Sequence, residues 1–339
     1  MSYSLIQQSA HIQADTQMGE DNSIGLDGGL FFMSAKMLRE NLEKYQDQPN
    51  WGEEVKKGLK VIREYEKWSN QMAAIMPARF VSINPTNLVE DLAKDLRSRI
   101  KELKEGESFL VPVNIKPPGG GFHTISVGIK REQNGRFSLN VYNLGLGSGN
   151  HYRDTNGKVY PFHIRNIPGG EITKLEFLKG FVDQATFKKE DTPGADNFYQ
   201  FLNDNLKGVD KGNEPDPTKD EEAYPLPSKL QDSGTCIWRS ALEGLRDHME
   251  PQAYKAFVFA MKRDNIDELC RKYLKDDLEK GVNPKEWKGD KVKAQRLVEI
   301  GIDEFEKRVS KAHARYAQVE EDAQKLNELQ KLKSRITIS

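Results

Sequence analysis

Apolar residues recur at helical spacing through the first third of the chain. Between about residues 29 and 76 they mostly follow one another at intervals of three to five, and Pro77 closes this run. A second stripe begins after Asn84 and Pro85, which together are typical of a helix start. Its members, Leu88, Leu92, Leu96 and Ile100, are four residues apart. Side chains three or four apart share one face of a helix, so the pattern predicts helices over both segments.

The spacing changes after about Ser108. Residues 109–115 form a short apolar run, and residues 122–129 and 137–142 alternate apolar with polar side chains. Alternation is the period of a strand with one buried face. We therefore expect strands here, with a further strand over 160–164.

A tight turn is predicted between the two alternating segments. Asn134-Gly135 favours a two-residue hairpin turn, because both central residues of such a turn need positive φ. This turn would set Asn143 across from Ser126. A bulge or a different turn would bring Asn143 closer to His123, at the start of the first strand.

Helical spacing returns in the C-terminal third. Helices are predicted from Gly234 to Met249, over 251–261 and over 266–274. A heptad seam follows, in which apolar residues step alternately by four and three, an average period of 3.5 that is typical of a coiled coil. The seam consists of Val298, Ile302, Phe305, Val309, Ala312, Tyr316, Val319, Ala323 and Leu326.

The seam predicts one long helix over about 291–336. In the interpretation that we favour, this helix packs along the N-terminal helices of its own chain. In the alternative it forms an intermolecular coiled coil, as a homodimer or with a partner helix.

Composition excludes several classes of protein. With 51 Lys+Arg against 52 Asp+Glu, the chain has no excess of positive charge for nucleic acid. No run of about 18 apolar residues could span a membrane, and 2 cysteines are too few for a disulfide scaffold. The first residues lack the pattern of a signal peptide. We therefore expect a soluble protein of a reducing compartment.

These elements together predict an α+β fold in four parts. Residues 1–25 are a flexible leader, 26–105 an N-terminal helical region, 106–275 the catalytic core, and 276–339 the long C-terminal helix. Within the core, 189–229 is expected to be a mobile insertion with one helix near 198–206, because residues 210–222 are charged and interrupted by prolines.

Cys236 is the first candidate for chemistry. A glycine-containing turn brings it to the first turn of an amphipathic helix, where the helix dipole and free N–H groups favour a thiolate. The same N–H groups, with the side chain of Gln231, can stabilise an oxyanion. Asp232 and Trp238 are expected to lie beside the thiol. The alternative is that Cys236 is a small buried apolar residue, as we expect for Cys270.

A base for this thiol is offered by the predicted hairpin. His123 opens one strand and Asn143 ends the next, so the amide oxygen of Asn143 can hold one imidazole nitrogen and aim the other at a thiol. His151 follows a glycine-rich loop and can approach as a further neighbour. No spacing of histidines and cysteines suits zinc, and no phosphate-binding loop is present, so we expect no metal and no cofactor.

The order His123, Asn143, Gln231, Cys236 resembles that of the circularly permuted papain-like cysteine proteases. This clan includes the SUMO- and ubiquitin-like-protein proteases, bacterial effector deubiquitinases and related acetyltransferases. Phe122-His123-Thr124 with Val141-Tyr142-Asn143 resembles the first half of the motif, and Gln231 to Cys236 the second. The resemblance covers about residues 105–250 and implies a papain-like core.

The resemblance also implies a function. It predicts a thiol hydrolase that cleaves peptide or isopeptide bonds through Cys236, His123 and Asn143, with removal of ubiquitin or a ubiquitin-like protein as the leading interpretation. An acyltransferase with the same triad and a non-catalytic coiled-coil interaction protein are the alternatives. The protein would act in its own cytoplasm or, delivered by a secretion system, as an effector inside a host cell.

Overall fold

The architecture comes from a computed structural model of the 339-residue chain. The described residues are 31–80, 86–115, 123–145, 148–155, 157–186, 195–206, 228–229, 236–312 and 319–337. The predicted leader, 1–25, lies outside them, as does most of the predicted insertion 189–229.

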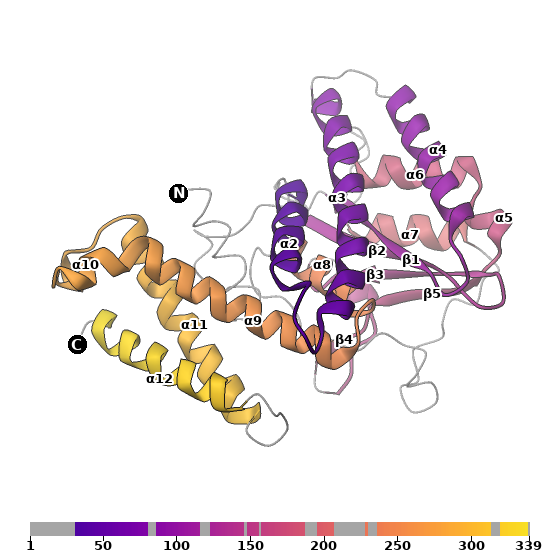
Figure 1. The fold of residues 1–339 in the computed structure, drawn as a ribbon. Helices are drawn as coiled ribbons and strands as arrows, with labels where there is room; N and C mark the ends of the chain where they lie inside the picture. Colours follow the sequence, from indigo (N-terminus) through magenta and orange to yellow (C-terminus); the bar gives the residue numbers. More distant parts are fainter. Residues whose placement is uncertain are drawn as a thin grey trace. The chain divides into compact units, whose positions relative to one another are not determined.

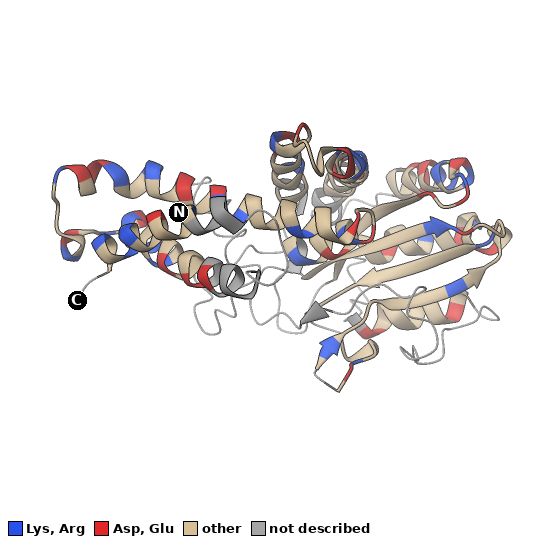
Figure 2. Ribbon diagram, turned by 60° about the horizontal axis from the view of Figure 1, so that its bottom comes forward, with Lys and Arg blue, Asp and Glu red and all other residues tan. Residues whose placement is uncertain are grey.

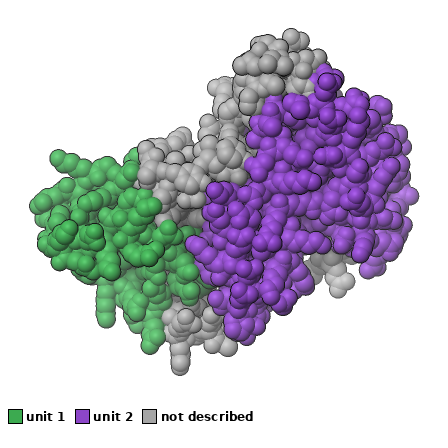
Figure 3. Space-filling view, turned by 45° about the horizontal axis from the view of Figure 1, so that its top comes forward, with its two compact units in different colours: residues 1–25, 255–339 green, residues 26–254 purple. Residues whose placement is uncertain are grey.

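The chain divides into two compact units (Figure 3). We call Leu26–Tyr254 the sheet unit and Lys255–Ser339 the helical unit; Met1–Gly25 is grouped with the latter. This division differs from the predicted one, because the N-terminal helices belong to the same unit as the sheet and the boundary falls at residue 254 instead of 275.

The sheet unit combines helices with a four-stranded antiparallel sheet of order β1-β2-β3-β5 (Figure 1). Its helices are α2 (Phe31–Tyr45), α3 (Gly52–Phe80), α4 (Thr86–Glu102), α5 (Gly169–Ile172), α6 (Leu175–Ala185), α7 (Ala195–Asn205) and α8 (Cys236–Arg246), with the 3₁₀ turn η3 (Ser148–Asn150). Its strands are β1 (Ser108–Ile115), β2 (His123–Arg131), β3 (Phe137–Tyr142), β4 (Lys158–Val159), β5 (Phe162–Ile167) and β6 (Ser228–Lys229), of which β4 and β6 pair separately.

Both faces of the sheet are covered by helices. On one face the odd-numbered residues of β2, such as Ile125 and Val127, join the core that includes side chains of α4, α6 and α7. On the other face the even-numbered Ser126 hydrogen-bonds Tyr65 of α3 at 3.0 Å and donates to Ser240 of α8 at 3.2 Å. Successive side chains of a strand point to opposite faces, so residue parity decides which helices a β2 side chain meets.

The β2–β3 turn is not the predicted two-residue turn. Glu132 N–H donates to the Arg136 carbonyl at 2.8 Å and Gly135 N–H to the Glu132 carbonyl at 3.0 Å, with Gly135 at φ 72°. A tight turn followed by one left-handed glycine makes a longer hairpin loop with a bulge, whose twist also suits the strands. Ser126 consequently pairs with Tyr142, and continuing that register sets Asn143 beside Ile125.

The helical unit holds most of α9 (Pro251–Leu269) and all later elements. These are the π-helical turn η4 (Cys270–Leu274), α10 (Lys275–Glu279), the 3₁₀ turn η5 (Pro284–Glu286), α11 (Asp290–Ala312) and α12 (Val319–Ile336). The two helices predicted over 251–261 and 266–274 are therefore wrong as separate elements. The polar residues 262–265 contain no glycine or proline, and such residues continue a helix at little cost.

The single C-terminal helix predicted over 291–336 is also wrong. Gln295 of α11 donates to the carbonyl of Ile336 at 2.6 Å, and Gln330 of α12 donates to Glu306 at 3.0 Å. An early residue of one helix thus meets a late residue of the other, so α11 and α12 are antiparallel. Val298 and Ile302 of the seam are buried in this unit. A heptad period serves such a helix pair as well as a continuous coiled coil, and cannot show where the chain reverses.

Charge and apolarity along the helices agree with the composition. Figure 2 shows acidic and basic residues interspersed along the helices, with few on the strands. Among the described helices, none combines the length and the apolar character that crossing a bilayer requires.

Candidate active site

His123 and Asn143 are brought together at one end of the sheet. His123 is the first residue of β2 and pairs with Ile115, and Asn143 directly follows β3. His123 Nε2 lies 2.9 Å from Asn143 Oδ1. The bulged turn makes this contact possible, since the predicted register would have sent the Asn143 side chain to the other face of the sheet.

The pair is buried and its hydrogen bond is shielded from water. Asn143 is 1% exposed and His123 6%. Burial lowers the pKa of His123 below its ordinary 6.5, and the hydrogen bond to Asn143 opposes this shift. The imidazole is therefore neutral at pH 7, as a general base must be before it takes a proton.

Asn143 belongs to a longer chain of hydrogen bonds. Its Nδ2 donates to Tyr199 Oη at 3.1 Å, and Tyr199 Oη lies 2.6 Å from His151 Nε2. His151 Nδ1 in turn lies 2.8 Å from the carbonyl oxygen of Tyr160. Gly145 N–H donates to Asn143 Oδ1 at 3.0 Å. These hydrogen bonds therefore hold both the oxygen and the nitrogen of the Asn143 amide.

Gly145 also sets the space around the imidazole. A Cβ built on Gly145 would lie 2.7 Å from His123 Cε1, closer than non-bonded carbon atoms can approach. Any larger residue at 145 must push the ring or the loop aside. A glycine is therefore required at position 145, because the backbone there lies so close to the ring of His123.

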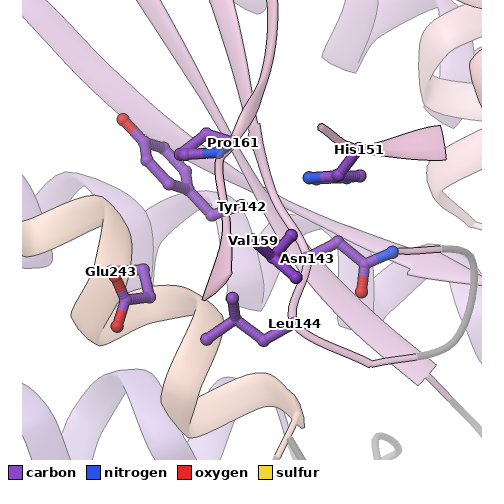
Figure 4. Close-up of a pocket in the computed structure, with 7 residues that line it drawn as sticks. All are labelled: Tyr142, Asn143, Leu144, His151, Val159, Pro161 and Glu243. Carbon is purple, nitrogen blue, oxygen red and sulfur yellow. The ribbon is translucent and has the colours of Figure 1, made fainter. Parts of the chain in front are cut away.

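A small pocket opens beside Asn143. It is lined by Tyr142, Asn143, Leu144, His151, Val159, Pro161 and Glu243 (Figure 4). Glu243 comes from α8, and the other residues come from β3, β4 and the loops that follow β3 and β4. The pocket therefore connects α8 with the hydrogen-bond chain of Asn143.

The direction of α8 follows from four contacts, two along the helix and two just after its end. Ser240 accepts the hydrogen bond of Ser126 near its start, and Tyr142 donates to Asp247 at 2.6 Å just after its end. Between them, Gly244 lies so close to Leu110 of β1 that a Cβ would be 2.7 Å from the leucine Cδ1. Tyr142 is opposite Ser126, so the contacts of Asp247 and Ser240 lie in the same row of the sheet. The contact of His248 with Ser108, at 3.2 Å, lies further along the strands and gives the direction of the helix.

Ser108 is opposite Lys130, at the far end of β2 from His123. The C-terminal end of α8 therefore lies toward the end of β2, and its first residue, Cys236, lies toward the start. Cys236 precedes Ser240 by about 6 Å of helix, and His123 precedes Ser126 by about 10 Å of strand. The backbone of Cys236 and that of His123 thus belong to the same end of the sheet.

The two lie on different faces. α8 packs on the face of Ser126, and parity gives His123 the face of α7. His123 occupies the last paired row of the sheet, so a group at the start of α8 can meet it only around this end. At this end of the sheet, Asn114, whose partner Thr124 has the parity of Ser126, donates to the carbonyl of Ala185 in α6 at 3.4 Å.

The remaining predicted residues are placed only in part. α8 begins at Cys236, as the glycine-containing turn predicts, and Trp238 is fully buried in its first turn. The side chain of Cys236 lies outside the described part of the structure, as do Gln231 and Asp232. Cys270 is buried as expected, and burial raises the pKa of its thiol to about 12.

Tyr199 is the residue that sequence reasoning missed. It lies in α7, within the segment predicted to be a mobile insertion, and it is 1% exposed. The apolar residues Phe198 and Leu202 recur at helical spacing, which predicted the helix near 198–206. Nothing in that spacing indicates that its hydroxyl meets Asn143.

Comparison of the chain with known family models and with curated proteins found no match to either. Within the described residues, no group of three or more His, Cys, Asp or Glu side chains is placed to hold a metal ion.

Proposed function

We propose that the protein is a thiol hydrolase in which Cys236 is the nucleophile, His123 the base and Asn143 the residue that orients the base. The observation that carries the proposal is the buried hydrogen bond between His123 Nε2 and Asn143 Oδ1. An amide oxygen only accepts, so Nε2 carries the proton and Nδ1 is left as the basic nitrogen. Within the described residues, that nitrogen has no hydrogen-bond partner.

The position of Cys236 at the start of α8 supports the same proposal. The free N–H groups and the dipole of a helix N-terminus lower the pKa of a thiol and stabilise negative charge. His123 Nδ1 would take the proton of the thiol, and the sulfur would attack a carbonyl carbon. The oxyanion would accept hydrogen bonds from the backbone N–H of Cys236 and from Gln231.

The second half of the reaction returns each proton. His123 would donate its proton to the departing amine, leaving an acyl group on the sulfur. A water molecule would then give a proton to Nδ1 while its oxygen attacks the acyl carbon. Release of the acid and return of that proton to the sulfur would regenerate the enzyme.

The resemblance to papain-like proteases suggests the substrate. We propose a peptide or isopeptide, with the C-terminal tail of ubiquitin or a ubiquitin-like protein first, cleaved in the cytoplasm of the producing cell or of a host cell. An acyltransferase would share the first half of the reaction and pass the acyl group to an amine instead of water.

Thiol alkylation tests the catalytic pair. In a Cys270→Ala background, which leaves Cys236 as the one thiol, we expect rapid reaction with iodoacetamide at pH 6. Adding His123→Ala should slow the reaction at least about tenfold, because the base contributes factors of this size or more. Equal rates with and without His123 would overturn the proposed role of the imidazole.

Ubiquitin propargylamide tests the substrate in the same proteins. We expect a covalent adduct that Cys236→Ala abolishes and Cys270→Ala leaves intact. An adduct with a SUMO probe alone would move the proposal to that modifier. Absence of any adduct, together with acyl transfer from a thioester to a free amine, would favour the acyltransferase.

A further inference from the structure

The four side chains of the hydrogen-bond chain admit one assignment of protons. A backbone carbonyl oxygen only accepts, so the Tyr160 carbonyl requires a proton on His151 Nδ1. A neutral His151 then accepts at Nε2, and Tyr199 must donate its hydroxyl proton there. The tyrosine oxygen is left as the acceptor for Asn143 Nδ2.

The neutral state of His151 follows from its surroundings. His151 is 6% exposed. Burial, together with the charge of Arg153, lowers its pKa to about 4 against the opposing effect of the hydrogen bond to Tyr160. The ring meets Tyr199 edge-on, with 5.4 Å between the ring centres. At pH 7 the proton therefore stays on Nδ1 alone.

A flipped Asn143 amide would break this chain at two places. With Nδ2 turned toward His123, the N–H of Gly145 would face another donor. With Oδ1 turned toward Tyr199, the hydroxyl would be drawn away from His151 Nε2, leaving that buried nitrogen without a donor. The intact chain therefore holds Oδ1 toward His123, and this orientation keeps the proton of His123 on Nε2.

We propose that Tyr199 and His151 are positioning residues, which fix the amide of Asn143 and through it the tautomer in which His123 Nδ1 is free to act as a base. The use of that base rests on the proposed function, whereas the tautomer itself does not. Tyr199 and His151 act through Asn143 and need not touch a substrate.

Nitrogen NMR of the full chain, labelled in its histidines, measures the tautomer directly. His123→Gln assigns the resonances of His123. In the unmodified chain at pH 7 we expect a protonated Nε2 and an unprotonated Nδ1. Tyr199→Phe removes the hydroxyl while keeping the ring in the core, and we expect a second population protonated at Nδ1. Tyr152→Phe is the matched control, because it removes a tyrosine hydroxyl from the residue after His151. It should leave the spectrum unchanged.

A second pair of variants tests the other end of the chain. His151→Gln keeps an acceptor for the Tyr199 hydroxyl and should preserve the tautomer. His151→Leu removes the acceptor and should produce the same mixture as Tyr199→Phe. If Tyr199→Phe does not fold, the two His151 variants still test whether these hydrogen bonds fix the tautomer of His123. A single Nε2–H tautomer in both Tyr199→Phe and His151→Leu would overturn the proposal.

Alkylation of Cys236 separates this proposal from the proposed function. If both hold, Tyr199→Phe in the Cys270→Ala background should slow alkylation at least about twofold for an even mixture of tautomers, because only the tautomer with a free Nδ1 can act as the base. The rate in His151→Gln should stay close to that of the parent. A tautomer that shifts while alkylation never depends on His123 would support the positioning role and refute the thiol hydrolase.

Discussion

At the scale of single residues, the candidate site depends on groups that leave no room for substitution. Gly145 approaches the ring of His123, and the Asn143 amide is held by donors and acceptors on both sides. A buried polar group without its partner costs about 1–3 kcal/mol. The exact fit of these few atoms therefore matters more than the number of contacts around them.

Gly145→Ala should disturb the imidazole directly. The new Cβ would lie 2.7 Å from His123 Cε1, and relieving such an overlap typically costs about 1–3 kcal/mol. We expect a lower urea midpoint and slower alkylation of Cys236. Gly149→Ala is the matched control, because a Cβ at 149 meets nothing within 4 Å. Equal effects of the two substitutions would contradict the close approach.

The carboxylate of Asp247 predicts a pH dependence of stability. Asp247 is an exposed residue, but its carboxylate contacts Tyr142. The loss of solvent around the carboxylate raises its pKa to about 6, although hydrogen bonding by Tyr142 and the charge of Arg246 lower it. Its pKa in the unfolded chain is about 3.9. Because the folded state binds the proton more tightly, this group stabilises the fold below about pH 4, and that contribution is lost as pH rises through about 6.

Asp247→Asn should remove this dependence. The difference in unfolding free energy between the variant and the parent should grow in favour of the variant by about 1 kcal/mol between pH 4 and pH 7, because solvent screens the charge of an exposed residue. The half-buried His248 and His163 have lowered pKa values and act in the opposite direction, but they are common to both proteins and cancel. Urea unfolding at several pH values measures the difference, and a constant difference would contradict the raised pKa of Asp247.

At the scale of elements, the site depends on how α8 lies against the sheet. Small or polar residues allow the helix to come close: Gly244 touches Leu110, and Ser240 bonds Ser126. The amphipathic pattern of residues 236–246 predicts that a helix forms and which of its sides is apolar. It cannot show that the partner of this side is the even-numbered face of β2.

Gly244→Ala should displace α8. The added methyl would lie 2.7 Å from Leu110 Cδ1, so we expect a loss of about 1–3 kcal/mol in unfolding free energy. Alkylation of Cys236 should slow, while the NMR tautomer of His123 should stay unchanged because β2 and β3 are not altered. Combining the change with Leu110→Ala should cost less than the sum of the two, as a coupled pair does. Full additivity would show that the two residues do not touch.

At the scale of the whole molecule, two units with separate cores occupy one chain. The seam residues Val298 and Ile302 are buried within the helical unit. They are therefore already covered by helices of the same unit. The described side chains of the candidate site belong to the sheet unit, so a substitution can destabilise the helical unit without altering any of them.

Leu329→Ala should open the helical unit selectively. Leu329 is 2% exposed and belongs to the same core as Cys270, so its truncation should cost about 2–5 kcal/mol. In a Cys236→Ala background, Cys270 should react with a thiol reagent at lower urea concentrations than in the parent. The exposed Lys331→Ala should leave the profile unchanged. An unaltered profile for Leu329→Ala would contradict the packing of α12 on this core.

Local periodicity determined most of the secondary structure in advance. It predicted the strands from 109 to 142 and a helix from Gly234, observed from Cys236, because spacing along the chain decides which side chains share a face. The order of His123, Asn143 and Cys236 likewise indicated where chemistry was to be sought. Each of these inferences depends on neighbours in sequence.

Only the tertiary structure decided how those elements meet. The bulged turn at Gly135 shifted β3 by one residue, which turned Asn143 to the face of His123. The antiparallel packing of α11 and α12 divided a continuous seam, and the fold brought Tyr199 to Asn143 across 56 residues of chain. A one-residue register shift reverses every side chain of a strand, and a long-range hydrogen bond leaves no periodic signal, so neither could be read from local pattern.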